Sequence, residues 1–166
     1  MHHYEHLVAA DDPTPPPGLA SSRFRDPHDV VELAKVDRLL GGSTCPEAWH
    51  LDAAGRFRCR YRGSSIESIR DWADDPYPLR RSRREGLASV DGCTDRWLIV
   101  ESRPTWTCPS PTVTEADAAA FVRVRRVLAD LGVHLLDCMV FDDRGHWWSL
   151  HELTSGSLRW DLDAAA

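Results

Sequence analysis

Hydrophobic and polar positions alternate along this 166-residue chain in blocks that predict strands and helices in turn. Residues 97–100 and 135–140 are short hydrophobic runs of the kind found in buried strands. Residues 29–40 and 114–131 repeat apolar side chains three and four positions apart, which predicts two amphipathic helices, the second ended by Gly132. Strands that alternate with helices favour an α/β fold, in which a mixed β-sheet is flanked by helices.

The remaining predicted elements are shorter. A hairpin is expected around the turn at residues 53–55, with a strand on either side. The second of these strands alternates strictly between arginine and a less polar residue. The shorter strands are expected at residues 47–51, 56–62 and 147–150, and the shorter helices at residues 65–72 and 83–90.

One folded domain is expected, at residues 26–156. Residues 1–25 are polar and rich in proline, which predicts disorder, and residues 157–166 are expected to form a C-terminal tail. No hydrophobic run is long enough to cross a membrane, and the first residues lack the pattern of a signal peptide. We therefore expect a cytoplasmic protein with no membrane partner.

Five cysteines are spread along the chain, an odd number with no C-x-x-C pair. This spacing argues against a disulfide framework and against a structural zinc knuckle. Most of the cysteines are expected to be buried, reduced thiols.

Basic residues are unevenly placed. The net charge is −6, and the chain holds 19 arginines against a single lysine. Arg56, Arg58, Arg60 and Arg62 recur at every second position, which places all four on one face of a strand, and a second cluster spans residues 80–84. Two interpretations stay open: a solvated face paired with acidic residues, or a basic surface that binds nucleic acid or an acidic protein.

The segment from Trp97 to Asp117 carries the most specific pattern. A hydrophobic strand ends in Glu101-Ser102-Arg103-Pro104, and after a Pro-rich loop a helix begins at Thr114-Glu115-Ala116-Asp117. This order resembles the RadC family of JAB/MPN metallopeptidase domains, in which a strand runs into His-x-His-Pro and a later Ser-x-x-Asp begins a helix. The resemblance extends over about residues 45–153, through a Leu-Asp turn at 51–56, an Arg-Glu pair at 84–85 and a strand, turn and strand at 135–150.

This resemblance implies a cytidine-deaminase-like α/β sandwich with a zinc site at the end of the strand. In the family the two histidines and the aspartate bind zinc, and a glutamate on an early strand activates the zinc-bound water. Here Glu101 and Arg103 stand at the histidine positions, Thr114 stands at the serine, and Asp117 is the one ligand position retained. Glu47 is the nearest candidate for the catalytic glutamate, and Thr114 is the other candidate catalytic residue.

The replaced ligands separate two possible functions. An arginine is always protonated and cannot bind zinc, so we expect a catalytically inactive pseudo-metallopeptidase without a cofactor, in which Arg103 pairs with Asp117 and Glu101 lies close by. Such a domain would bind a protein partner or nucleic acid through the arginine strand face and an exposed Trp106. The alternative is an active zinc-dependent hydrolase, an isopeptidase or peptidase, whose site is rebuilt from Glu101, Asp117, Cys108 or a distant histidine.

Overall fold

The structure is a computed structural model that describes residues 7–9, 22–37, 47–63, 69–74, 96–103, 113–130 and 132–162. Within these ranges, residues 7–9, 34–37, 59–63, 72 and 74 are described by their backbone alone. The helix predicted at residues 83–90 and the arginine cluster at residues 80–84 lie outside the described residues.

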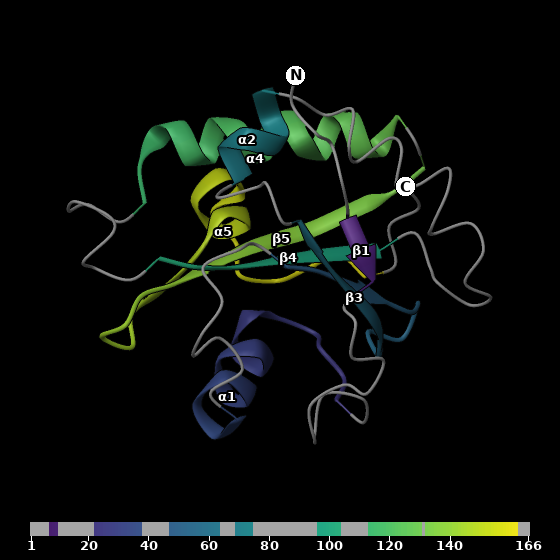
Figure 1. The fold of residues 1–166 in the computed structure, drawn as a ribbon, viewed down its shortest axis with the longest axis vertical. Helices are drawn as coiled ribbons and strands as arrows, with labels where there is room; N and C mark the ends of the chain where they lie inside the picture. Colours follow the sequence, from purple (N-terminus) through teal and green to yellow (C-terminus); the bar gives the residue numbers. More distant parts are fainter. Residues whose placement is uncertain are drawn as a thin grey trace.

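A six-stranded sheet forms the middle layer of the domain (Figure 1). Its strand order is β1-β3-β2-β4-β5-β6. Strands β4 and β5 run parallel, whereas the other neighbouring strands are antiparallel, so the sheet is mixed as predicted. The strands are β1 (Leu7–Ala9), β2 (Glu47–Leu51), β3 (Phe57–Gly63), β4 (Arg96–Ser102), β5 (His134–Phe141) and β6 (Trp147–Ser149).

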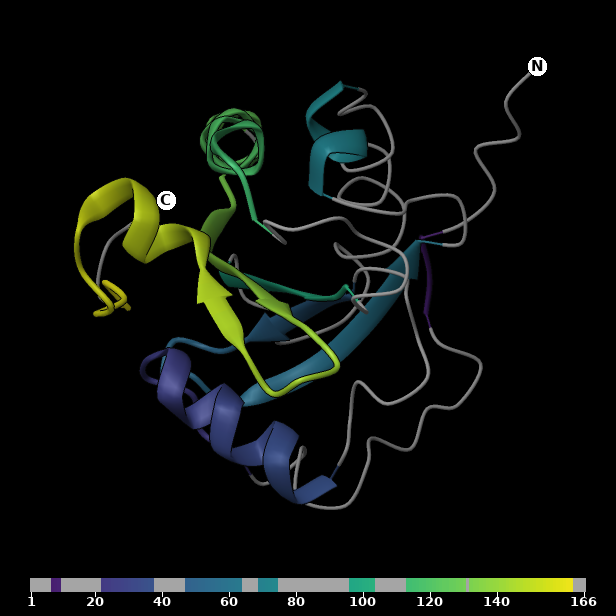
Figure 2. The same cartoon turned by 90° about the vertical axis from the view of Figure 1, so that its left-hand side faces the viewer.

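Helices cover both faces of the sheet (Figure 2). Helix α1 (Pro27–Asp37) lies on one face, and α2 (Ile69–Asp74) and α4 (Glu115–Ala129) lie side by side on the other. Helix α5 (Leu150–Ser155) follows β6 directly and contacts α4 and β5. This arrangement confirms the predicted α/β class, a mixed β-sheet flanked by helices.

Two hydrophobic cores result, one on each face of the sheet. The α4-side core is formed by alternate residues of β4 packed against α2 and α4. The α1-side core is formed by the intervening residues of β4 packed against α1. Fully buried members of the first include Ile69, Trp97, Ile99, Phe121 and Leu128, and those of the second include Phe24, Val30, Leu51, Leu98 and Val100.

The alternation between the two cores breaks once in β5. Trp97 pairs with Leu135, but the next residue, Leu98, pairs with Asp137, so Leu136 is an extra residue in the ladder. Such a bulge changes which residues face each side. Leu136 belongs to the α1-side core, and Asp137 accepts a hydrogen bond from Trp160 in that same core. The bulge therefore places a carboxylate among apolar side chains.

Two turns at opposite ends of the sheet have the same construction. Asp52 Oδ1 accepts the N–H groups of residues 54 and 56 at 2.8 and 2.9 Å, and Asp142 Oδ1 accepts those of residues 144 and 146 at 2.8 Å each. Each turn contains a glycine with positive φ, 80° at Gly55 and 84° at Gly145. Because β2 runs antiparallel to β4 and β5 runs parallel to it, the β2–β3 turn lies where β4 and β5 begin. The β5–β6 turn lies at the opposite end.

The folded region extends beyond both predicted boundaries. The disorder predicted for residues 1–25 does not hold for residues 7–9, which form β1 on the edge of β3, nor for residues 22–25. There Phe24 is fully buried, and its N–H donates to the Gly55 carbonyl at 2.8 Å. The tail predicted at residues 157–166 is part of the fold as far as Leu162, because Trp160 is buried in the α1-side core.

The other predicted elements are confirmed with shifted boundaries. The helices predicted at residues 29–40, 65–72 and 114–131 correspond to α1, α2 and α4, and the predicted strands correspond to β2 through β6. Helix α5 replaces the end of the last predicted strand, because Ser149 Oγ accepts the Glu152 N–H and caps a new helix. Among the helices of the described residues, none combines the length and apolar character that crossing a membrane requires.

Candidate functional site

The end of β4 and the start of α4 meet at one point of the sheet. Arg103 directly follows β4, and its N–H donates to the carbonyl of Phe141, the last residue of β5, at 2.7 Å. Thr114 is the N-cap of α4. Both its N–H and its hydroxyl donate to Asp117 Oδ2, at 2.8 and 3.1 Å. A carboxylate in the first turn of a helix is stabilised there by the N–H groups that have no partner within the helix.

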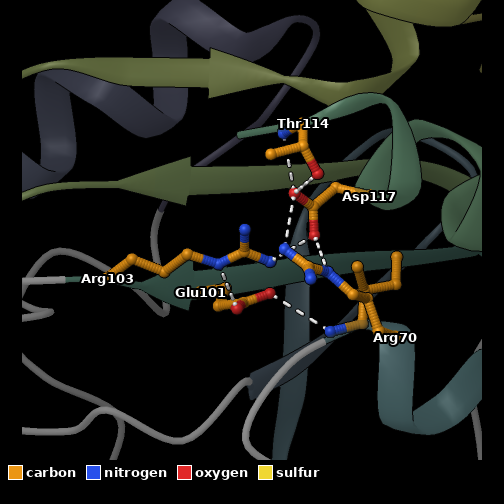
Figure 3. A network of polar contacts seen from close by, with 6 residues as sticks. Arg70, Glu101, Arg103, Thr114 and Asp117 are labelled. Atoms are coloured by element: carbon orange, nitrogen blue, oxygen red, sulfur yellow. Dashed lines mark hydrogen bonds and ion pairs between the residues drawn. The ribbon is translucent and has the colours of Figure 1, made fainter. Parts of the chain in front are cut away.

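A buried ion-pair network joins these two elements (Figure 3). Arg103 Nε donates to Glu101 Oε1 at 2.6 Å, and Arg103 Nη2 donates to Asp117 Oδ1 at 3.0 Å. The Arg103 side chain is 5% exposed, and both carboxylates are 0% exposed. The predicted pairing of Arg103 with Asp117, with Glu101 beside it, is confirmed. The guanidinium thus lies between the two carboxylates.

Helix α2 contributes the remaining contacts of the network. Arg70 Nε donates to Asp117 Oδ1 at 2.7 Å, and Arg70 Nη2 donates to Asp117 Oδ2 at 3.2 Å. The neighbouring Ile69 N–H donates to Glu101 Oε2 at 3.3 Å. The Arg70 side chain is 48% exposed, so it borders on solvent while the other members are enclosed. Bidentate contact of this kind fixes the orientation of both charged groups.

The network is electrically balanced, because two guanidinium groups face two carboxylates. Burial alone would raise the pKa of Asp117, but hydrogen bonds from Arg70, Arg103 and the Thr114 N–H hold it well below its usual range. Burial alone would lower the pKa of Arg103, and its two carboxylate partners raise it above its usual range. Burial raises the pKa of Glu101, and the contact with Arg103 offsets this in part. Asp117 and Arg103 therefore stay charged at neutral pH.

These residues do not fit a zinc ion. Catalytic zinc takes three neutral or anionic protein ligands and keeps one position open for water. Here the Arg103 guanidinium lies between Glu101 and Asp117, and both Asp117 oxygens already accept hydrogen bonds. In the part of the chain that the structure describes, no three His, Cys, Asp or Glu side chains converge. Cys108, a ligand in the predicted alternative, lies outside the described residues.

Glu47, the predicted catalytic glutamate, is not part of this network. It pairs with Val100 in the sheet, and partners in adjacent strands point to the same face. Val100 belongs to the α1-side core, whereas Glu101, one residue further, points to the α4 side. Glu47 accepts the Trp49 Nε1–H at 3.0 Å within the α1-side core. The strand periodicity thus separates Glu47 from Asp117 by the thickness of the sheet, which argues against a shared catalytic role.

The predicted arginine face on β3 also requires correction. Arg56 precedes the strand, and the pairing of β2 with β3 is irregular between His50 and Leu51. Such an irregularity interrupts the strict alternation of the strand at Arg58, which has no partner in the ladder. Arg58 and Arg56 are exposed, and Arg58 pairs with Asp52 in the turn. The side chains of residues 60 and 62, and the whole of Trp106, lie outside what the structure describes.

Two residues with structural importance were missed from the sequence. Arg70 had no sequence signal, because its role depends on the packing of α2 against α4. Asp137 is the second, a carboxylate that is 0% exposed. It accepts hydrogen bonds from Ser149 Oγ at 2.6 Å, from the His151 N–H at 2.9 Å and from Trp160 Nε1 at 3.0 Å. A polar residue inside the hydrophobic run at residues 135–140 was the available signal.

Comparison with the models of known protein families finds none that matches this chain, and a search of curated proteins finds no match either. The resemblance to JAB/MPN domains therefore rests on the order of the sequence motifs. What the structure adds is that Glu101, Arg103 and Asp117 meet at one point.

Proposed function

We propose that this chain is a catalytically inactive domain of the RadC-like JAB/MPN type, which acts by binding a protein or nucleic acid partner. The observation that carries the proposal is the Arg103 guanidinium between Glu101 and Asp117. Two of the three residues at the family's ligand positions are carboxylates, and the third is a cation that balances their charge together with Arg70. The arginine therefore takes over the structural role of the metal.

The chemistry of hydrolysis supports an inactive site. A zinc hydrolase lowers the pKa of a metal-bound water and needs a base beside it. In this network the Asp117 oxygens are held by two arginines and by Thr114, and Glu47 lies on the other face of the sheet. What the network does supply is rigidity, because it joins β4, α2 and α4 through charge-assisted hydrogen bonds.

The alternative is an active zinc-dependent hydrolase with non-standard ligands. Such a site would draw on Asp117, Glu101 and Cys108 or a histidine, and would require Arg103 to move out of the network. Moving the buried guanidinium away would leave the two carboxylates of the network with one remaining counter-charge, Arg70, which is paired with Asp117. The geometry of the described residues therefore favours the inactive domain.

Zinc content tests the proposal. Protein purified without added metal is expected to contain well under one equivalent of zinc by elemental analysis. Stoichiometric zinc that is lost in Asp117→Ala would contradict the proposal and favour the hydrolase. Removal of His2, His3 and His6 serves as the control, because zinc lost only in that variant is bound adventitiously by the N-terminal histidines and leaves the proposal standing.

A further inference from the structure

Arginines gather at the end of the sheet where β4 and β5 begin, opposite to the buried network. Arg96 is the first residue of β4 and pairs with Leu51, the last residue of β2. Strand β3 begins next to Leu51, so Arg56 and Arg58 lie at the same end, and Arg23 forms an antiparallel bridge with Arg56. Neighbouring strands lie about 4.8 Å apart, so these arginines form a row along this end of the sheet.

The C-terminal segment adds to this row. Arg96 Nε donates to the Leu162 carbonyl at 2.8 Å, which ties residues 157–162 to the start of β4. Arg159 lies within this segment, and its side chain is exposed. We call five residues together the basic end: Arg23, Arg56, Arg58, Arg96 and Arg159.

Most of the basic end is not neutralised by carboxylates of the described residues. Arg58 pairs with Asp52, Nη2 to Oδ2 at 3.0 Å. Arg23 and Arg96 donate to backbone carbonyls instead. Within the described part of the chain, the side chains of the other two members make no hydrogen bond or ion pair. Their guanidinium groups are therefore available to a ligand.

The neighbourhood of the basic end holds more arginines than aspartates among the described residues. Arg25, next to Arg23, and Arg126, in the last turn of α4, are also exposed. These seven arginines outnumber the five aspartates of the same neighbourhood, although the whole chain has a net charge of −6. The aspartates nearby are Asp26, Asp29, Asp52, Asp130 and Asp161, of which the first three accept backbone N–H groups.

An acidic protein partner is the less suitable occupant. Protein interfaces derive most of their affinity from a few large, buried anchors such as aromatic side chains. In the described residues the exposed large hydrophobic side chains are Val122 on α4 and Leu153 on α5, and neither is on the strands and turn that carry the arginines. A nucleic-acid backbone needs no such anchor, because phosphate contacts by arginine supply most of the sequence-independent affinity.

We propose that the basic end binds the phosphate backbone of nucleic acid without sequence preference. The inference deepens the proposed binding role and rests on it. The planar guanidinium group suits a phosphate, which it can contact through two parallel hydrogen bonds. Because the basic end and the ion-pair network lie at opposite ends of the sheet, zinc content and nucleic-acid binding test the two proposals separately.

The two similar turns provide a matched pair of variants. Arg56 directly follows the glycine of one Asp-x-x-Gly turn, and Arg144 directly precedes the glycine of the other, at opposite ends of the sheet. Both arginines are exposed, and neither side chain makes a hydrogen bond or ion pair within the described part of the chain. The experiment measures the anisotropy of labelled single-stranded and double-stranded oligonucleotides at salt concentrations between about 50 and 200 mM. The full chain is compared with Arg56→Gln, Arg144→Gln and the double variant Arg56→Gln/Arg159→Gln.

For the parent, a plot of the logarithm of the binding constant against the logarithm of the salt concentration is expected to have a negative slope. Each arginine removed from the basic end should make it shallower by about 0.7 for single strands or about 0.9 for duplex. Arg144→Gln should leave it unchanged. Equal weakening by Arg56→Gln and Arg144→Gln would overturn the proposal, as would absence of binding at the lowest salt. Binding of a labelled polyglutamate peptide, with no binding of either oligonucleotide, would assign the basic end to an acidic protein instead.

Discussion

Replacing Arg103 with alanine should destabilise the domain through the carboxylates that it leaves behind. Glu101 would keep one hydrogen bond, from the Ile69 N–H, and Asp117 would keep Arg70 and Thr114. Breaking a buried pair by removing one partner costs about 3–5 kcal/mol. Because Asp117 retains a bidentate arginine, we expect a loss of about 2–4 kcal/mol at pH 8, carried mainly by Glu101.

The destabilisation caused by Arg103→Ala should depend on pH, and its direction follows from the pKa of Glu101. Burial raises the pKa of Glu101, and removing Arg103 raises it further. A carboxyl whose pKa is higher in the folded state than in the unfolded chain, about 4.3, binds more protons when folded, so stability rises as the pH falls towards that value. The opposite sign applies to Asp117, whose lowered pKa causes stability to be lost as the pH falls below about 4. The destabilisation should therefore be smaller at pH 5 than at pH 8.

Urea unfolding at both pH values measures this effect. With an m-value of about 2 kcal/mol/M, the expected loss at pH 8 moves the midpoint down by about 1–2 M. Arg144→Ala is the control, because its exposed side chain has no partner among the described residues and should shift stability by less than about 0.5 kcal/mol. A midpoint for Arg103→Ala equal to that of the parent, or a loss that does not change with pH, would show that Arg103 does not compensate the buried charge of Glu101.

Two further substitutions test other parts of the fold. Asp137→Ala should destabilise the domain by about 3 kcal/mol, because it leaves buried donors, including the Trp160 indole, without an acceptor. Faster proteolysis after residue 156 would show that the C-terminal segment is released. An unchanged cleavage rate would contradict this role of Asp137. Gly55→Ala should destabilise more than Gly145→Ala, because both have positive φ but an added Cβ meets the Phe24 carbonyl oxygen at 2.2 Å only in the first case. The difference between the urea midpoints of the two variants measures the effect of the steric contact with Phe24. Equal midpoints would show that the segment around Phe24 moves to make room for the added Cβ.

The sequence predicted the central layers well because their patterns reflect burial. The run at residues 97–100 is buried throughout, and the apolar stripe of α4 includes Phe121, Val124 and Leu128, all fully buried. Periodicity is a reliable signal where one face of an element meets the core. The pair of Arg103 and Asp117 was predicted through the resemblance to JAB/MPN domains, which places both residues at the ligand positions of one zinc site.

Features that depend on tertiary contacts could not be obtained in this way. Arg70 reaches Asp117 from 47 positions away, and nothing in the local sequence marks that distance. The strict alternation at residues 56–62 suggested a uniform face, but a register irregularity interrupts it. The buried Trp160 reversed the expectation of a tail, since one aromatic side chain is enough to anchor a polar segment. Ser149 and Glu152 did carry a capping signal for α5, which the hydrophobic run beside them obscured.

Helix α2 is six residues long, which is too short for a helix to persist in water by its own hydrogen bonds. Its conformation is therefore supplied by its surroundings: Arg70 at its start contacts Asp117, and the carbonyl of Ala73 near its end accepts a hydrogen bond from Arg123 of α4 at 3.0 Å. The rate of hydrogen exchange at the backbone amides of α2 consequently reports how often either of these two contacts breaks. The exchange rate of α2 is therefore a local measure of the stability of the buried ion-pair network.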